Sequence, residues 1–394
     1  MSDVTVTASP LAAADLAADR ALADIATSFR FLLDVTPVDL VRTREEFWDS
    51  GRPPAFEYRP LSDDPAVVRT RLADVPLHAV EDPTVAHLLQ DKHRELLLLM
   101  EMLACRGTPE FLALSIEQYG TVSPSLLEEA EDILRRVQGR ELDPGPSLDA
   151  DAFVRLAQAE LDRYRAFAPD MESHVEVREG STGVMVSNGD LLVAPTARVS
   201  MARADALLHH EIGTHVVTFV NGSHQQLRTL ASGLAGHDET QEGLAVFAEY
   251  LVGGLTPGRL RQLAARVVAV HRMVDGAAFP EVHQGLVDAG VPAVQAFTIT
   301  MRVFRSGGLT KDAVYLRGLH ELVNHLGAGA SLDPLWLGKM PLTAVPLVED
   351  LHRRGVLSDP LLIPRYLDEP VARARLAVIH QVDSLVALIG DVPP

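Results

Sequence analysis

The chain has 394 residues, and its 47% apolar and 23% charged content is that of an ordinary globular protein of roughly one to three domains. The 54 acidic residues outnumber the 35 basic ones, and the formal net charge of −19 argues against nucleic acid as the main partner, because phosphate binding needs a positive surface. A single cysteine excludes a disulfide framework and a cysteine-rich zinc site. The N-terminus lacks a basic segment followed by an apolar run, and no long apolar stretch occurs, so we expect a cytoplasmic protein with no membrane partner.

In the first third of the chain, apolar residues recur mostly at helical spacing. The stretch 38–76 is interrupted by several prolines and is predicted to be extended chain and loop. The segment ELDPGPSLD (141–149) is the clearest linker, so we place a boundary between an N-terminal helical and extended region (1–145) and a C-terminal region with the chemical motifs (146–394), which could still pack as one domain. Helices are predicted over 11–33, 83–105, 108–119 and 124–138.

The strongest β signal follows a predicted helix over 150–167. A short strand is expected at 174–177, and two apolar runs then flank Asn188-Gly189, the pair that is typical of a type I′ hairpin turn. From residue 200 onward the pattern is again helical, including a helix over roughly 203–220. We therefore predict an α+β fold that is mainly helical, with one small mixed or antiparallel sheet next to the helix over 203–220.

That helix contains the sequence HEIGTH, with His210 and His215 five positions apart. In the common HExxH zinc motif the histidines are four apart and share a helix face. In a regular helix a spacing of five would turn the two rings about 140° from each other. A π-helical bulge would bring them together, and Gly213 and Thr214 are poor helix formers at the right place. Glu211 would then lie beside a bound metal as a general base.

A helix predicted from His237 could supply a third metal ligand. Glu242 and Glu249 are seven apart on it and share a face, while Glu239 lies one turn before Glu242. Carboxylate oxygen suits zinc, so Glu242 is the candidate ligand, and Glu249 is a candidate for orienting a ligand histidine.

Spacing alone does not settle which residues bind a metal, because the chain holds a second HExxxH. His320, Glu321 and His325 repeat the pattern, and two acids (349–350) follow at a similar distance. The second copy lies on an amphipathic helix without a glycine to ease a bulge. The first copy is favoured, and the absence of any metal site stays open at this point.

HEIGTH followed by QEGLA (241–245) resembles the QEGLA-motif family of metallopeptidase-like proteins. Bacterial members are named flavohaemoglobin expression-modulating QEGLA motif proteins, and animal relatives include the tyrosine carboxypeptidase that trims α-tubulin. The similarity runs from about residue 20 to the C-terminus, with supporting stretches at 169–194 and 302–316. The resemblance implies a zincin-like metallopeptidase. Its Zn²⁺ would be held by His210, His215 and Glu242, and Glu211 would be the catalytic base. The family motif does not use the second HExxxH, so we interpret His320 and His325 as surface or packing residues.

Two further features are candidates for substrate contacts. Arg302, Arg305 and Lys311 surround a Gly-Gly pair, and such bases could bind a terminal carboxylate, although ion pairing at the surface is an equally good interpretation. At least one of them is expected to face the cleft. Tyr315 could donate to an oxyanion, or it could simply be a core residue. Only three basic residues of the chain are lysines, and that bias by itself says nothing about chemistry; they are Lys92, Lys311 and Lys339.

We therefore expect a zinc-dependent peptidase. The resemblance implies that it is a carboxypeptidase, which removes a C-terminal and by the same resemblance aromatic residue from a peptide or protein tail. The edge of the hairpin could hold that tail as an added strand. A zinc endopeptidase or aminopeptidase is the first alternative. A metal-stabilised regulatory protein without turnover is the second, and the intact Glu211 argues against it, because a structural site needs no base.

Overall fold

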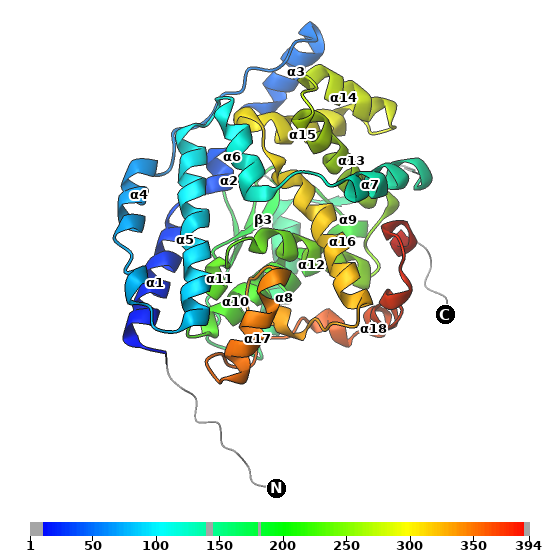
Figure 1. Cartoon of the computed structure of the whole chain (residues 1–394). Coiled ribbons are helices and arrows are strands. Elements are labelled where there is room, and N and C mark those ends of the chain that lie inside the picture. The colour runs from blue at the N-terminus through cyan, green and yellow to red at the C-terminus, as the bar shows by residue number, and fades with distance from the viewer. Residues whose placement is uncertain (1–10, 139–144, 180–182, 390–394) are drawn as a thin grey trace.

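The computed structural model describes residues 11–138, 145–179 and 183–389, and these form the mainly helical α+β fold expected from the sequence (Figure 1). The α-helices are Ala13–Ser28 (α1), Phe31–Asp34 (α2), Leu40–Ser50 (α3), Pro65–Ala73 (α4), Pro83–Ala104 (α5), Glu110–Tyr119 (α6), Pro124–Arg136 (α7), Ala150–Arg165 (α8), Met201–His210 (α9), Val217–His224 (α10), Thr229–Ser232 (α11), His237–Leu251 (α12), Pro257–Val274 (α13), Phe279–Asp288 (α14), Ala293–Phe304 (α15), Val314–Gly327 (α16), Val345–Arg353 (α17) and Pro370–Ala377 (α18). The strands are Ser147–Leu148 (β1), Val175–Val177 (β2), Val184–Ser187 (β3), Asp190–Val193 (β4) and Val199–Ser200 (β5).

The prediction that 38–76 is extended chain and loop is wrong, because α3 and α4 lie within it. Prolines in this stretch lie at the ends of helices and do not prevent helices from forming. Pro65 opens α4 at a position where its missing N–H costs nothing, and the Asp64 side chain caps the helix by accepting a hydrogen bond from the Ala66 N–H (2.9 Å). The predicted helix over 11–33 is also shorter than expected and ends at Ser28.

The main sheet has the order β2-β4-β3, with β2 parallel and β3 antiparallel to the central β4. The predicted hairpin is confirmed. Asn188 (φ 50°) and Gly189 (φ 85°) both take the left-handed conformation of a type I′ turn. A Cβ at Gly189 would lie 2.3 Å from the ring of Phe219 on α10, so only glycine allows the turn to pack on that helix. Strand β3 is left at an edge of this sheet.

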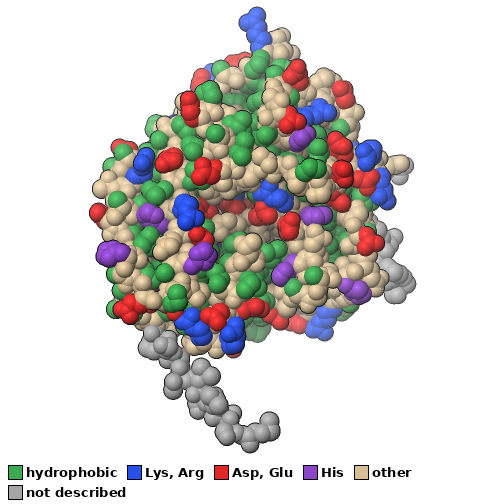
Figure 2. Space-filling model, viewed as in Figure 1, with side chains coloured by type: hydrophobic (Ala, Val, Ile, Leu, Met, Phe, Trp, Pro, Cys, Tyr) green, Lys and Arg blue, Asp and Glu red, His purple; other side chains and the backbone are tan. Residues whose placement is uncertain are grey.

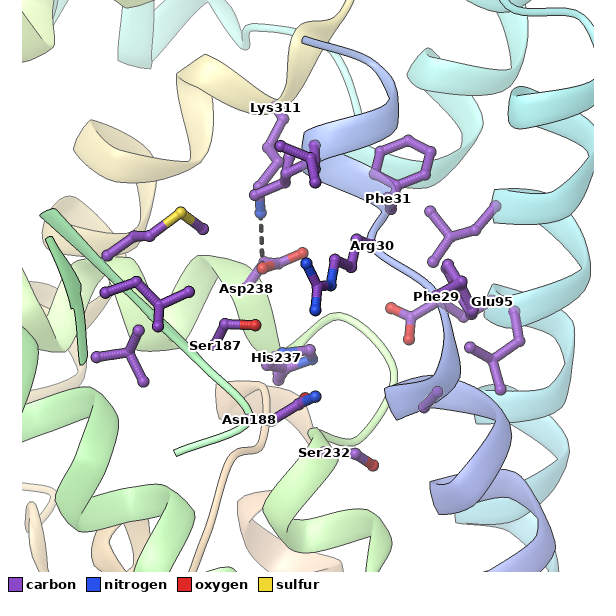
Figure 3. A pocket seen from close by; sticks show the side chains of 18 of the residues that line it. Phe29, Arg30, Phe31, Glu95, Ser187, Asn188, Ser232, His237, Asp238 and Lys311 are labelled. Atoms are coloured by element: carbon purple, nitrogen blue, oxygen red, sulfur yellow. Dashed lines mark ion pairs between the residues drawn. The ribbon is translucent and has the colours of Figure 1, made fainter. Parts of the chain in front are cut away.

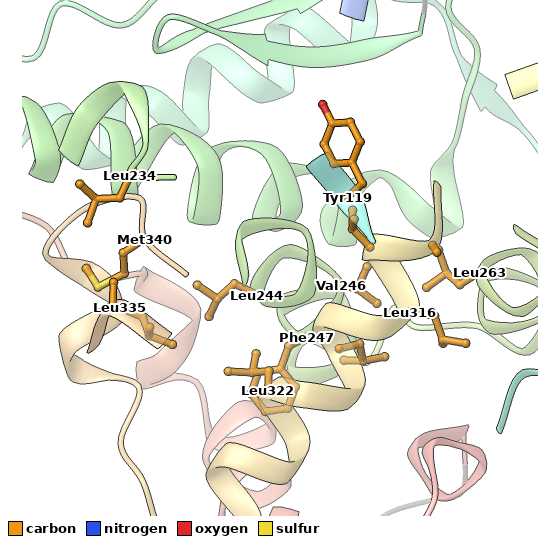
Figure 4. Packing of buried hydrophobic residues seen from close by; sticks show 14 of the residues in the cluster. Tyr119, Leu234, Leu244, Val246, Phe247, Leu263, Leu316, Leu322, Leu335 and Met340 are labelled. Carbon is orange, nitrogen blue, oxygen red and sulfur yellow. The ribbon is translucent and has the colours of Figure 1, made fainter. Parts of the chain in front are cut away.

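Helix α12 contacts both α9 and α16, and Figure 4 shows its buried side chains packed against those of α16. It approaches α16 so closely that a Cβ on Gly318 would lie 2.0 Å from the Glu239 carbonyl oxygen, and a Cβ on Gly243 would lie 2.3 Å from the Gly318 carbonyl carbon. Apolar side chains such as Leu244 and Leu322 close the space around this contact. This close backbone contact therefore fixes the position of α12 along its axis relative to α16.

The largest apolar cluster joins residues from both predicted regions, for example Leu22 and Leu89 with Leu244 and Trp336. In Figure 1, α1, α4 and α5 stand along one side of the molecule, and α3, α14 and α15 form a projection at one end. The first four residues of the linker predicted at 141–149 lie outside the described residues, and the short strand β1 falls within the rest. Among the described helices, none combines the length and apolar character needed to span a membrane.

Candidate active site

The segment between α9 and α10 is a π-helix, Glu211–Val216, so the predicted bulge is confirmed. The Thr214 hydroxyl donates to the His209 carbonyl oxygen five residues earlier (3.1 Å), which suits the wider turn. A Cβ on Gly213 would lie 3.1 Å from the ring of Tyr366, so the glycine also lets this turn pack closely. The widened turn brings the rings of His210 and His215 to a centroid distance of 5.2 Å.

The structure brings His210 and His215 together with Glu242 of α12. The Nε2 atoms of both histidines lie 3.8 Å from Glu242 Oε2, and the three side chains offer ligand atoms within 4.8 Å of one another. Tetrahedral zinc with bonds of about 2.0–2.2 Å holds its ligand atoms roughly 3.3–3.6 Å apart. The donor set and its spacing therefore fit a zinc ion. Among the described residues, no other group of acids, histidines and cysteines meets the same criterion.

A fully buried carboxylate orients the first of these histidines. The Nδ1 of His210 lies 2.9 Å from Glu249 Oε1. Arg203 and Arg259 donate to the same carboxylate at 2.7 and 3.1 Å. Burial opposes ionisation, but the charges of Arg259, His210 and Arg203 hold the pKa of Glu249 well below its usual range. An ionised Glu249 accepts the Nδ1 proton, which leaves the Nε2 lone pair directed at the cluster.

His215 has a neutral partner instead. Its Nδ1 lies 3.5 Å from the Gln241 side-chain oxygen, a long contact, and that oxygen also accepts a 2.8 Å hydrogen bond from the Thr218 hydroxyl. Burial and the neighbouring His210 hold the pKa of His215 well below its usual value. His215 is thus uncharged at neutral pH, which is the form that binds metals.

Glu211 lies at the edge of the cluster, where its Oε1 is 4.0 Å from His210 Nε2. Burial raises the pKa of Glu211 to about 7, with the charges of Glu242 and Glu249 adding to the effect and His210 opposing it. A carboxyl group with a pKa near neutrality can both accept and return a proton. His209, next to the first ligand, points away as expected, because its ring stacks edge-on against Tyr366 at a centroid distance of 5.2 Å.

The three predicted carboxylate-binding bases all have internal partners. Arg302 makes a bidentate pair with Asp312 (2.7 and 2.8 Å), and the buried Arg305 donates to the Thr36 hydroxyl at 2.8 Å. Lys311 is buried as well and pairs with Asp238 at 2.6 Å.

Tyr315 is partly buried, with the Arg266 guanidinium 4.7 Å from its ring centroid. Burial and then the charge of Glu242 raise the pKa of Tyr315. Its predicted role as a donor to the oxyanion stays a prediction.

A cavity of about 360 Å³ reaches Asp238, one helical turn along α12 from Glu242, although none of the clustered side chains themselves line it. Its wall is formed by side chains of the α1–α2 connection and α5, by β3 and the hairpin turn, and by the start of α12. Figure 2 shows this face hollowed near its centre, with acidic and basic side chains in the hollow. In Figure 3, the side chains of Arg30, Asp238 and His237 point into the cavity, and the Lys311 side chain points toward Asp238.

The second HExxxH is not assembled into a site. His320 and His325 lie on the regular α-helix α16, and Glu321 is exposed. Asp350, one of the acids that follow, pairs with Arg353 and Arg354 instead. Sequence reasoning found the three clustered residues and Glu249, but it missed Arg203 and Arg259, which carry no motif.

One protein family has a sequence model that matches residues 45–383, and its description is microtubule-associated tyrosine carboxypeptidase. The match includes α9, the π-helical turn and α12, and hence every residue of the cluster. No curated protein is significantly similar to the chain.

Proposed function

The chain belongs to the microtubule-associated tyrosine carboxypeptidase family, and we propose that it is a zinc-dependent carboxypeptidase that removes a C-terminal residue from a peptide or protein tail. The observation that carries the proposal is the meeting of two imidazoles and one carboxylate within 4.8 Å, with a second buried carboxyl group beside them. His210, His215 and Glu242 would hold the zinc. When bound, zinc polarises a carbonyl group and lowers the pKa of water.

Glu211 would move the proton. Its carboxylate takes a proton from the attacking water and returns it to the nitrogen of the leaving amino acid. Glu249 and Gln241 hold the two imidazole rings in place through their Nδ1 atoms. The Tyr315 hydroxyl would donate to the oxygen that becomes negatively charged as the carbonyl is attacked.

The substrate tail would enter along β3. That strand lies at an edge of its sheet and lines the cavity, so its backbone can pair with an extended peptide. The cavity, at about 360 Å³, is large enough for one side chain and carries aromatic walls such as Phe29 and Phe31. Of the three bases predicted to bind the terminal carboxylate, Lys311 is the one that lines this cavity.

The test compares two synthetic peptides that end in tyrosine, one with a free carboxylate and one amidated, incubated with purified zinc-loaded protein. Mass spectrometry should show loss of one residue from the acid and none from the amide. Internal cuts in both peptides would favour a zinc endopeptidase, and loss of N-terminal residues would favour an aminopeptidase. Stoichiometric zinc without any cleavage would favour the metal-stabilised regulatory protein.

A further inference from the structure

All three lysines of the chain gather around the start of α12, although they come from segments far apart in the sequence. Lys92 on α5 pairs with Glu95 (2.6 Å), and Lys311 pairs with Asp238 (2.6 Å). Both lysines line the cavity, and both charges are balanced by a neighbouring carboxylate.

The third lysine, Lys339, is fixed against the segment that leads into α12. Its backbone N–H donates to the Leu230 carbonyl oxygen at 2.7 Å, and its own carbonyl oxygen accepts from the Leu234 N–H at 2.9 Å. Its ammonium nitrogen lies 5.6 Å from the ring centroid of Phe219. Phe219 is one turn after His215 on the same helical segment and packs under the hairpin turn. The ammonium group therefore lies beside a ring that is one helical turn from the second metal-binding histidine and that also packs under the hairpin turn.

Lys339 differs from the other two lysines because its charge has no direct partner. Within the described ranges, no carboxylate oxygen lies within 4.0 Å of its Nζ, and no hydrogen bond to this atom is found. Asp238 and Glu242 act on it from a greater distance, but the first already pairs with Lys311 and the second belongs to the histidine cluster. Burial lowers the pKa of Lys339 to about 8, so its ammonium group has lost part of its hydration. A partly buried cation of this kind gains most from an anionic ligand.

The distance to the cluster suits a carboxypeptidase. In a carboxypeptidase substrate, one residue separates the bond that is cut from the terminal carboxylate, and consecutive Cα atoms are about 3.8 Å apart. The receptor for the carboxylate must therefore lie a few ångströms beyond the metal ligands. The Lys339 ammonium nitrogen lies 5.6 Å from the ring centroid of Phe219, and Phe219 is about one helical turn after His215, which places this charge in that range.

We propose that Lys339 binds the terminal carboxylate of the substrate and is the residue that restricts the site to C-terminal cleavage. The inference rests on the proposed function, because it presumes a peptide held at the cluster. Lysine suits the task as a compact point charge. Arg302 and Arg305 already donate to Asp312 and Thr36.

The experiment uses the full-length zinc-loaded protein and the acid and amidated tyrosine peptides. Lys339→Met keeps most of the aliphatic stem and removes the charge, and it should lower kcat/KM for the acid by roughly 10- to 150-fold, the range of one charged hydrogen bond, mainly through KM. Lys339→Arg should restore part of this loss. Arg353→Met, which changes an exposed base on α17, is the matched control and should act as wild type.

Binding is measured separately in the Glu211→Gln background by calorimetry with the same two peptides. The acid should bind more tightly than the amide, and Lys339→Met should abolish the difference while zinc content stays at wild-type level. A preference for the acid that survives Lys339→Met in both assays would overturn this inference and leave the carboxypeptidase proposal standing. Equal treatment of acid and amide by the wild-type protein would overturn both.

Discussion

The chain contains the pattern HExxxH twice, and the two copies have different structures. Residues 210–215 lie on a π-helical turn, with both rings directed at Glu242. Residues 320–325 lie on a regular α-helix, where a spacing of five turns two side chains about 140° apart. The same letters thus give a cluster in one place and two separate histidines in the other.

The neighbouring helix decides what each copy can do. Helix α12 gives the first copy both Glu242 and Glu249, and so both a ligand and an orienting partner. Helix α16 contacts the same α12 from another side, through the close approach of Gly318 to Gly243. The second copy therefore lies on a helix that supports the first site by packing.

The largest contrast is expected between Glu211→Gln and Glu321→Gln. The first change replaces a buried base by an amide that cannot accept the proton, so kcat should fall by a factor of about 10²–10⁴ with the zinc content and thermal stability preserved. The second changes an exposed carboxylate and should leave kcat within error of wild type. A kcat of the Glu211 variant equal to that of wild type would contradict the assignment of Glu211 as the catalytic base.

Asp312→Asn tests the structural role of α16, the helix that carries the second HExxxH copy, because Asp312 lies in the turn directly before this helix. It is buried against Arg302 and Arg266, so the variant leaves two guanidinium groups without their counter-charge and should lose about 3–5 kcal/mol of unfolding free energy at pH 7. Burial opposes ionisation, but the two arginines hold the pKa of Asp312 well below its usual range. The stabilisation by this carboxylate is therefore complete above about pH 4 and declines as the pH falls further.

Denaturant unfolding at several pH values measures this effect. The gap between wild type and variant should be widest at neutral pH and should narrow below about pH 4. A gap that grows as the pH falls would show that Asp312 stabilises the fold in its protonated form.

Glu249→Gln tests whether α12 also orients the first metal-binding histidine, through the charge of Glu249. The amide still accepts a hydrogen bond from His210 but has no charge to hold the imidazole in the metal-binding tautomer. Zinc affinity, measured by competition with a chelating dye, should fall by a factor of about 10–100. Glu321→Gln is again the control, and an unchanged affinity in the Glu249 variant would mean that the buried carboxylate serves packing alone.

Much of the first site could be predicted from local sequence. Gly213 and Thr214 signalled the bulge, Asn188-Gly189 signalled the hairpin, and the spacing of Glu242 and Glu249 placed them on one helix face. Arg203, Arg259 and Lys339 could not be found in this way, because each acts through a contact between segments that are distant in sequence. The stretch 38–76 was predicted wrongly for a related reason. A proline that begins a helix cannot be distinguished in the sequence from one that interrupts it unless the capping residue before it is recognised.

Zinc content is the most direct test of the difference between the two copies. Wild-type protein, His215→Ala and His325→Ala are purified, loaded with zinc, dialysed and analysed by plasma mass spectrometry. We expect one zinc per chain in the wild type and in His325→Ala, and none at stoichiometric level in His215→Ala. Loss of zinc from His325→Ala together with retention in His215→Ala would contradict the assignment and move the site to the second copy.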